Sequence, residues 1–494
     1  MALHADVGWS VLAGLAGLVA ALVLLERIRT PAALRRYPAY PPGAGLSSLP
    51  HLLLDLWHPQ GVSAGLVDAH ARLRSSVLRT GPKRLHLSTA SAQVLKDIGS
   101  LDKAPAYAAF DLGSATVFSS RSRADHGARA SVVASLFTKT AVRDKADVVS
   151  DAVHATLDVL DKKVGSGTAQ VNLLALFRAF AIDVAATLYC GKTYGATHAL
   201  RHGDFMSTDI GLIHDHFNEA VPLGLWSPAY GPKLRTAHEK LTTAWRKVSP
   251  AKSKAVHEQD KLTAALAHYE AFVDGAVSSP DAAYPAAMAR APAYAQLDAT
   301  EQRAAISVEC YDLLFAASES LAATLAVGLL RLHTAEASSS LERVRSALQA
   351  QGSGEEQLLQ ATVNECLRVT SPVPRALDRI VGAKGLRLDD GTFLPAGTVI
   401  GIGQQALHQP DTPFSLSKWL DEDGAPASIA FGLPGAPSRA CLARALAEEE
   451  LRQMLAAFLR RFEVVQPVLP RGRDMFNVGF PRGLVAAQVS RRRA

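Results

Sequence analysis

Apolar residues recur at three- and four-residue spacing through most of the chain between residues 60 and 370, and this pattern predicts helices. The segments 148–159 and 173–188 are clear examples, with alanine filling many of the remaining positions. Glycine and proline clusters interrupt the pattern near 218–233 and 278–293. We therefore expect this part of the chain to be mainly helical.

The pattern changes in the last quarter of the chain. Alternating apolar residues around Asp390 and Gly391 predict a short hairpin within 385–402. The segment 403–440 is rich in proline, glycine and serine and is expected to be a long ordered loop, which in a compact body usually has a function. Helical periodicity returns over 442–462, and 483–489 is expected to be a strand. Because the helices are expected in the first part of the chain and the small sheets in the last part, the sequence predicts a mostly α (α+β) fold.

The N-terminal segment has a different pattern. Residues 7–25 carry no charge, and a run of about 19 apolar residues is long enough to cross a bilayer. Arginines at 27, 29, 35 and 36 follow it, so the positive-inside rule places the rest of the chain in the cytosol. We expect an uncleaved anchor. A signal peptide, which would need a basic leading region, and a buried helix are the alternatives.

A proline- and glycine-rich stretch follows the apolar run and is typical of a stiff linker. The expected organisation is an anchor over 1–30, a linker over 31–50 and a single catalytic domain over 51–494.

Composition narrows the classes of function. The 494 residues are 48% hydrophobic, which fits a large buried core. The net charge of +6 is too small and too dispersed for nucleic-acid binding, but it suits an acidic protein partner or an anionic membrane face. The four cysteines form no C-x-x-C pair, which argues against a zinc site, and their spacing does not indicate a disulfide framework. Free thiols are expected, and one of them could bind a metal.

The most informative cysteine is Cys441, which ends a glycine- and proline-rich loop just before a predicted helix. Free N–H groups and the dipole at a helix N-terminus would stabilise a thiolate and lower its pKa. A thiolate there could donate electron density to a bound iron. Arg439 would reach an acidic group such as a haem propionate. The alternative is a buried structural cysteine.

This loop resembles the haem-binding signature of the cytochrome P-450 family, F-x-x-G-x-R-x-C-x-G. Phe431, Arg439 and Cys441 match it if an insertion is allowed. Three additional residues lie between Phe431 and Cys441, Pro437 stands at the first glycine, and Ala443 replaces the glycine after the cysteine. The resemblance implies that Cys441 is the axial ligand of a haem iron, with Phe431 and Arg439 contacting the cofactor. The departures imply a longer loop beneath the haem.

A second match to the family is its E-x-x-R helix motif, at Glu365 and Arg368. The two residues share one face of a helix and can pair. The resemblance implies a third partner from the later loop, which here would be Lys418, where the family usually has arginine. An ordinary surface pair is the alternative.

A third match lies at 314–320, which resembles the oxygen-groove motif A/G-G-x-D/E-T. It implies that Glu319 and Ser320 relay protons to iron-bound oxygen. Ala317 replaces glycine and Ser320 replaces threonine. A small-residue face for helix packing is the alternative.

Three further positions are implied as haem contacts. Arg379 matches the second propionate arginine, with a surface role as its alternative. His126 matches a helix whose third cationic contact usually lies four residues later, but that position is Ala130. Arg129 or His126 itself is the expected substitute.

The resemblance implies the cytochrome P-450 fold and a monooxygenase that inserts one atom of dioxygen into a hydrophobic small molecule. It further implies haem b, a flavin reductase that uses NADPH, and a single-pass anchor in the endoplasmic reticulum with a cytosolic domain. The overall likeness is closer to fungal members of the family that make secondary metabolites. Pocket-lining segments are expected near 106–124, 206–230, 308–320, 372–378 and 476–484.

Two other classes of function remain open at this point. One is a haem-thiolate isomerase or dehydratase that rearranges a peroxide without a reductase, which the long cysteine loop and the altered groove motif favour. The other is a haem-binding sensor or carrier without turnover, which the acid and hydroxyl at Glu319 and Ser320 argue against.

Overall fold

The structure is a computed structural model. It describes, besides a few positions between 21 and 58, residues 30–47, 61–111, 113–202, 208–226, 252–350, 352, 354–409, 411–420, 429–434, 439–469, 472–475, 478–481 and 485–492. The predicted membrane anchor at 7–25 lies almost entirely outside these residues, as do parts of the cysteine loop and of the expected pocket-lining segments.

The fold is mostly helical, as predicted, with small sheets at its edges. The α-helices are α3 (Val62–Leu73), α4 (Ala92–Gly99), α5 (Arg123–Val133), α6 (Lys139–Arg143), α7 (Ala146–Val164), α8 (Leu173–Cys190), α9 (Ala196–His202), α10 (Asp209–Trp226), α12 (Lys252–Val277), α13 (Ala283–Met288), α14 (Pro292–Ala295), α15 (Ala299–Leu332), α16 (Ser338–Ala350), α17 (Glu355–Thr370), α18 (Gln404–His408), α19 (Ser417–Leu420) and α20 (Arg444–Arg461). Short 3₁₀ helices are η1 (Ala32–Leu34), η2 (Pro105–Phe110), η3 (Ala134–Phe137) and η4 (Ala335–Ala337).

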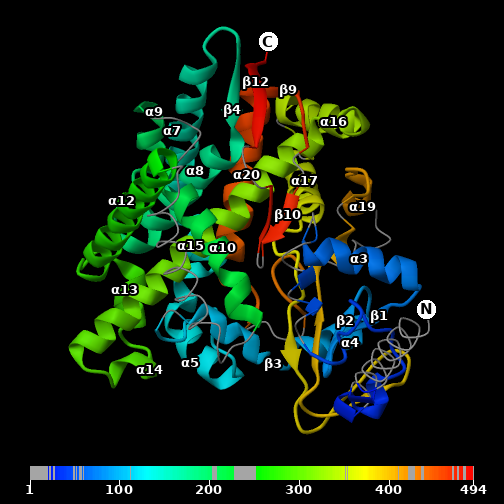
Figure 1. Ribbon diagram of the computed structural model, residues 1–494. Helices are drawn as coiled ribbons and strands as arrows, with labels where there is room; N and C mark the ends of the chain where they lie inside the picture. The colour runs from blue at the N-terminus through cyan, green and yellow to red at the C-terminus, as the bar shows by residue number, and fades with distance from the viewer. Residues whose placement is uncertain are drawn as a thin grey trace, which may run out of the picture.

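The strands form four small sheets. They are β1 (Val77–Gly81), β2 (Arg84–Leu87), β3 (Asp102–Lys103), β4 (Thr168–Asn172), β5 (Arg379–Ile380), β6 (Leu386–Arg387), β7 (Phe393–Leu394), β8 (Val399–Ile402), β9 (Phe462–Gln466), β10 (Gly472–Met475), β11 (Val478–Pro481) and β12 (Ala486–Arg491). The sheet orders are β1-β2-β8-β5-β3, β4-β12-β9, β10-β11 and β6-β7. In Figure 1 the five-stranded sheet lies at the lower right, and the long helices fill the left and the centre.

The core is built around α8 and α15, which pack along each other in the middle of the molecule (Figure 1). All residues of α8 except Thr187 are buried, as expected of a helix that is apolar on every face. In the part of the chain that the structure describes, α8 and α15 are also the two helices long and apolar enough to cross a membrane. Because 94% and 67% of their apolar windows are buried inside the protein, both are core helices.

The five-stranded sheet joins segments that are far apart in the sequence. Strand β8 pairs in parallel with β2 and in antiparallel fashion with β5, which pairs in turn with β3. In the last pair Lys103 lies directly opposite Arg379. The sheet therefore brings a basic residue from the first quarter of the chain next to one of the predicted haem contacts.

Several predicted elements need correction. The hairpin exists as β6 and β7, with Gly391 in the left-handed region at its turn, but 399–402 belongs to the larger sheet. The expected loop over 403–440 contains α18 and α19. Helix α10 continues to Trp226, through part of the expected break, because a tertiary environment can override local breakers.

Candidate functional site

Cys441 directly precedes the two-residue turn that leads into α20, which begins at Arg444. The N–H of Cys441 donates to the carbonyl of Phe431 at 2.8 Å, so the two ends of the loop are tied together. Gly432, next to Phe431, has φ +118°, and a Cβ atom there would lie 3.2 Å from Cα of Ala440. The loop thus needs glycine at a position that the sequence comparison did not single out.

The side chain of Cys441 is exposed, whereas the other three cysteines are buried. Burial nevertheless raises the pKa of the Cys441 thiol, against the opposing effects of the Ala443 N–H and of Arg444. The thiol is therefore accessible although much protein surrounds it. The Ala443 N–H lowers this pKa, as predicted for the helix terminus, but desolvation outweighs that effect and the net pKa is raised.

Four basic side chains gather near this loop. Arg439 donates to the carbonyls of Ser120, at 2.7 Å, and of Arg121, at 2.6 Å, and so ties the cysteine loop to the chain before α5. Burial and then the charge of Arg379 lower the pKa of Arg439 to about 10. The same two arginines, after burial, lower the pKa of Lys103. Burial, Arg439 and Lys103 lower the pKa of His126 to about 3.

This cluster fits a dianionic group such as the two carboxylates of haem. Among the residues that the structure describes, three of its buried nitrogens have no hydrogen-bond partner: Nδ1 of His126, Nε of Arg379 and Nε of Arg439. An anion would satisfy such donors and relieve the repulsion that lowers their pKa values. The accessible thiol of Cys441 can supply an iron ligand, so the residues present fit the expected cofactor.

The basic cluster includes one residue that was not predicted and lacks one that was. Arg129 does not join the cluster: its Nε donates to the Tyr294 hydroxyl at 3.0 Å, and its guanidinium pairs with Asp125. Lys103 does join it, although nothing in the local sequence around it indicated this. Its position depends on the pairing of β3 with β5, which links residues far apart in the chain.

The E-x-x-R pair on α17 is a buried brace and not a surface pair. Arg368 and Glu365 form two hydrogen bonds of 2.7 Å, and both side chains are almost fully buried. Arg368 also donates to carbonyl groups in 408–413, for example to Gln409 at 2.8 Å. The pair therefore holds the segment that leads to the cysteine loop.

Lys418 does not complete this pair, and that prediction is wrong. Its Nζ lies 3.5 Å from Thr412 Oγ1, and no ion pair among the described residues joins it to Glu365. The carboxylate of Glu365 instead accepts from the Trp419 indole N–H at 2.8 Å and from the Ser415 amide at 2.7 Å. The indole neighbour thus takes the place expected for a cation.

On α15 the two predicted relay residues point in different directions. Ala316 is exposed and Ser320 half-buried, and the Ser320 hydroxyl donates back to the Ala316 carbonyl at 3.3 Å. Glu319 is buried instead, and its carboxylate binds Arg178 of α8 and lies 3.2 Å from His214 of α10. Glu319 directly precedes Ser320, and successive helical residues are about 100° apart, so the two side chains leave the helix in different directions. Glu319 therefore does not lie on the accessible side of α15 with Ser320, and its part in a proton relay stays a prediction.

His214 and Ser318 complete this buried network, and sequence reasoning missed both. The His214 Nε2 lies 2.9 Å from the Ser318 hydroxyl. Burial raises the pKa of Glu319, and Arg178 opposes that rise. Burial and the charge of Arg178 lower the pKa of His214, so the histidine is neutral and Arg178 is the cation that balances the acid.

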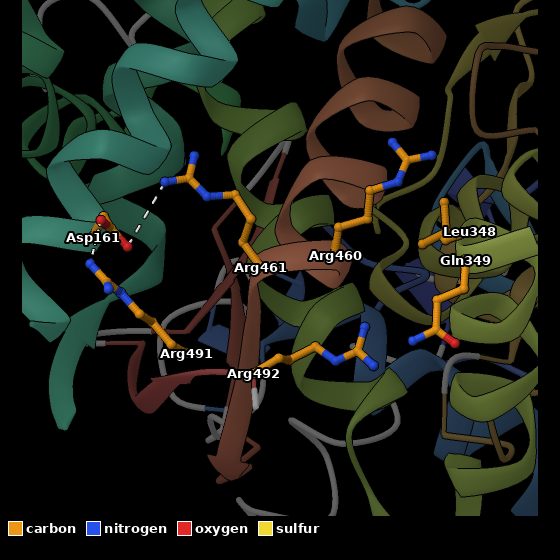
Figure 2. Close-up of a pocket in the computed structure, with 7 residues that line it drawn as sticks. All are labelled: Asp161, Leu348, Gln349, Arg460, Arg461, Arg491 and Arg492. Carbon is orange, nitrogen blue, oxygen red and sulfur yellow. Dashed lines mark hydrogen bonds and ion pairs between the residues drawn. The ribbon is translucent and has the colours of Figure 1, made fainter. Parts of the chain in front are cut away.

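A cleft of about 450 Å³ lies elsewhere, at the far end of α20. Figure 2 shows its four arginines, of which Arg461 and Arg491 point toward Asp161. Arg460 pairs with Glu355 at 2.6 Å. These pairings engage three of the four arginines, and none of the predicted site residues lines the cleft.

The comparisons with known proteins agree with this geometry. The family model for cytochrome P450 matches residues 85–481. The chain is 26% identical to the cytochrome P450 monooxygenase aneF of Aspergillus aculeatus, over 86% of this chain and 88% of the relative. It is 25% identical to the cytochrome P450 monooxygenase hkm5 of Aspergillus hancockii, over 93% and 91% respectively. It is 24% identical to a pisatin demethylase of Fusarium vanettenii, over 81% and 78%.

The match thus includes α15, the α17 pair and the Cys441 loop. Membership implies a haem cofactor, a redox partner that supplies electrons, and a hydrophobic substrate. With the accessible cysteine, the basic cluster and the family match all in agreement, the chain belongs to the cytochrome P450 family and is an oxygen-incorporating oxidoreductase.

Proposed function

We propose that this protein is a membrane-anchored monooxygenase that inserts one oxygen atom from O₂ into a hydrophobic intermediate of fungal secondary metabolism. The observation that carries the proposal is Cys441, the one accessible cysteine of the four, tied to Phe431 within the family's matching loop. The similarity of the chain to fungal monooxygenases over most of its length supports the assignment.

The cofactor would be haem b, which supplies the redox chemistry with dioxygen when bound. Cys441 would hold its iron, with the Ala443 N–H directed at the sulfur. Arg379, Arg439 and His126 would bind its carboxylates with their unpartnered nitrogens. Phe431 would act through its carbonyl, which fixes Cys441, and its ring lies beneath the Arg444 guanidinium at 5.1 Å.

Ser320 of α15 would hold a proton for the reduction of dioxygen. Its hydroxyl bonds only weakly to the Ala316 carbonyl, at 3.3 Å, so it can turn toward a new acceptor. Glu319 would act from the buried side of the helix, where the charge of Arg178 balances its own and neutral His214 lies beside it. It would serve as a proton reservoir and not as a groove residue.

Electrons would come from an NADPH-dependent flavin reductase, and the protein would sit on the endoplasmic reticulum with its catalytic domain in the cytosol. Three side chains near the end of the predicted anchor support membrane attachment. Leu24, Leu25 and Ile28 are 60%, 43% and 70% exposed, which is unfavourable in water and favourable in lipid.

The test is a reconstitution with and without NADPH and reductase, on a panel of polyketides, terpenoids, sterols and fatty acids. Product should require NADPH. In Ser320→Ala the ratio of product to NADPH consumed should fall and peroxide should rise, because a positioned proton donor is typically worth about 10²–10⁴-fold in rate. Ser320→Thr keeps the hydroxyl and should retain most of the coupling.

The opposite result has a clear meaning. Full activity on an organic hydroperoxide without NADPH, with no effect of Ser320→Ala, would overturn the monooxygenase assignment in favour of a rearranging enzyme. Such an outcome would leave Cys441 as the iron ligand.

A further inference from the structure

One acidic residue lies on the accessible face of α15. Asp312, Ala316 and Ser320 follow one another at four-residue spacing, so they share a face of the helix. Ala316 is exposed, and Asp312 and Ser320 are half-buried, whereas Leu314 and Ser318 on other faces are buried. Asp312 therefore faces the same space as the predicted oxygen groove, about two turns nearer the start of the helix.

The carboxylate of Asp312 is held but not neutralised. Its Oδ2 accepts from the Thr116 hydroxyl at 2.7 Å, and the Phe118 N–H also donates to it. Among the described residues no cationic group lies within 4.0 Å of it. Burial raises the pKa of Asp312 to about 6, while Thr116 and the charge of Lys103 oppose the rise. At pH 7 the group is mostly ionised.

Lys103 is the nearest candidate to neutralise this charge, but it is engaged elsewhere. Its Nζ donates to the Phe118 carbonyl and lies 4.2 Å from the centre of the Phe118 ring and 4.6 Å from that of Tyr107. An ionised carboxylate offers about four acceptor positions, of which two are used here. Asp312 thus keeps acceptor capacity in a poorly solvated place, where an added hydrogen bond is strong.

The surroundings of Asp312 are aromatic. Phe118, whose amide contacts the acid, packs against Phe110 with ring centres 5.3 Å apart and against Tyr107 at 5.8 Å. Phe217 of α10 packs against the same cluster. These rings form an apolar surface that suits a flat apolar molecule, and the Asp312 carboxylate lies beside that surface.

We propose that Asp312 is a specificity-determining residue that binds a hydrogen-bond donor, a hydroxyl or a protonated amine, on an otherwise aromatic substrate. The inference rests on the proposed function and names its substrate class. An aromatic molecule with such a donor would place its ring against Phe118 and its donor on Asp312, and this would orient the rest of the molecule along α15 toward Ser320.

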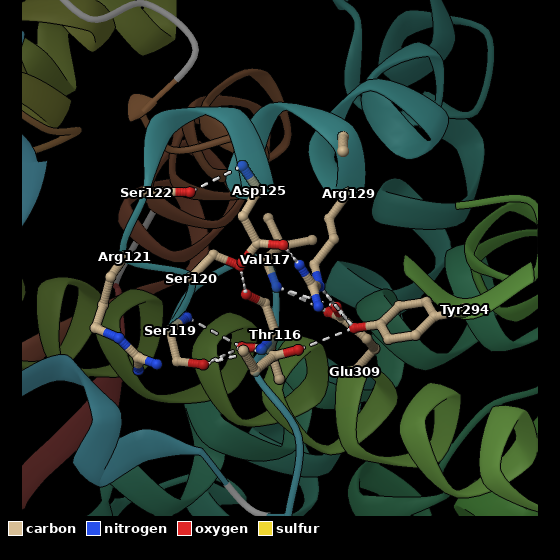
Figure 3. A network of polar contacts seen from close by, with 12 residues as sticks. Thr116, Val117, Ser119, Ser120, Arg121, Ser122, Asp125, Arg129, Tyr294 and Glu309 are labelled. Atoms are coloured by element: carbon tan, nitrogen blue, oxygen red, sulfur yellow. Dashed lines mark hydrogen bonds and ion pairs between the residues drawn. The ribbon is translucent and has the colours of Figure 1, made fainter. Parts of the chain in front are cut away.

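Glu309, one turn earlier on α15, provides the contrast. It is 1% exposed, and its acceptor positions are filled by the Tyr294 hydroxyl at 2.6 Å, the Tyr284 hydroxyl at 3.2 Å and the Val117 amide at 3.0 Å. Figure 3 shows this network between α15, α14 and the chain before α5. Glu309 and Asp312 both bind the segment 116–118, but Glu309 is not accessible to a ligand. Substitution of Glu309 is therefore a matched control for substitution of Asp312.

The experiment measures dissociation constants of the haem-loaded protein for two pairs of probes, by optical titration and by quenching of tryptophan fluorescence. The pairs are 2-naphthol with 2-methoxynaphthalene, and 2-(2-naphthyl)ethylamine with 2-ethylnaphthalene. The shape of the spectral change identifies any amine that binds the iron directly. In the wild type each donor should bind about ten-fold or more tightly than its partner, as expected for a hydrogen bond to a charged group.

Asp312→Leu should reduce both ratios to about one, while binding of the neutral ether and of the hydrocarbon persists. Asp312→Asn keeps an acceptor for Thr116 and should lower the amine ratio more than the naphthol ratio. Glu309→Gln should leave both ratios unchanged. Wild-type ratios near one, no binding of any probe, ratios that survive Asp312→Leu, or equal losses in Glu309→Gln would overturn the proposal.

These readings are independent of turnover. If the wild type forms no NADPH-dependent product but shows the expected binding ratios, the proposed function is overturned and the role of Asp312 stands. If the wild type turns over normally but Asp312→Leu leaves the binding ratios unchanged, the role of Asp312 is overturned and the proposed function stands. The carbon-monoxide spectrum of each variant confirms that haem is present.

Discussion

Replacing Glu365 with alanine should destabilise the protein more than any surface charge substitution. In the wild type Glu365 is fully buried, and its carboxylate accepts two hydrogen bonds from Arg368, one from Trp419 and one from the Ser415 amide. The alanine variant leaves the Arg368 charge, which is only 4% exposed, without a counter-ion. An uncompensated buried charge costs about 3–5 kcal/mol.

That cost is large compared with the whole stability of a typical protein, about 5–15 kcal/mol. We expect it to be concentrated near the haem, because Arg368 also holds the carbonyls of 408–413 that precede the cysteine loop. Glu365→Ala should therefore lower both the urea midpoint and the fraction of protein that carries haem. Glu365→Gln keeps one acceptor oxygen, so its urea midpoint and its haem-loaded fraction should lie between those of the wild type and of the alanine variant.

The control is the exposed pair of Arg303 and Asp274, with an N···O distance of 3.5 Å and side chains 45% and 63% exposed. Exposed ion pairs contribute about 0–1 kcal/mol to the free energy of unfolding, so the urea midpoint of Asp274→Ala should be close to that of the wild type. Urea titrations followed by circular dichroism, together with haem absorbance, measure both variants. A loss of less than about 1 kcal/mol in Glu365→Ala would refute the reasoning that this pair is a buried brace.

Two further variants test the anchor and the cysteine loop. Deleting residues 1–30 should move the protein from the membrane to the soluble fraction with its haem spectrum intact; a soluble but haem-free truncation would contradict the separation of anchor and catalytic domain. Gly432→Ala should cost about 1–3 kcal/mol and reduce haem retention, because φ is +118° and Ala440 lies 3.2 Å from the added Cβ. Gly113→Ala, which has φ +98° but open space around it, should leave haem retention unchanged, and equal retention in both variants would show that the close approach is unimportant.

The sequence was sufficient to predict the parts of the fold that depend on local periodicity. The expected helices at 148–159 and 173–188 are α7 and α8, and the helix after Cys441 is α20. These segments could be recognised because each presents its pattern within a few turns. The exposed state of Cys441 and the burial of the other cysteines also agree with the choice of Cys441 as the functional thiol.

The missed features depend on contacts between distant segments. Lys103 reaches the basic cluster only because β3 pairs with β5, across a long separation in sequence. Trp419, and not Lys418, meets Glu365, because the turn of α19 directs neighbouring side chains to different sides. A spacing motif identifies which residues take part but not which way each one points.

Glu319 illustrates the same limit on one helix. The motif correctly placed it on α15, but its partners Arg178 and His214 come from α8 and α10. Those contacts bury Glu319, and a buried carboxylate requires a cation nearby. Only the three-dimensional arrangement could show that the acid lies behind the groove.

The central claim is that Cys441 is the axial ligand of a haem iron, and the carbon-monoxide difference spectrum of the reduced protein tests it most directly. The wild type should show the thiolate-type band, and so should Cys366→Ser, whose cysteine is buried against Gly328 in the core. Cys441→Ala should lose the band, and Cys441→His should bind haem with a band of the imidazole type. A thiolate-type band that survives in Cys441→Ala would contradict the account.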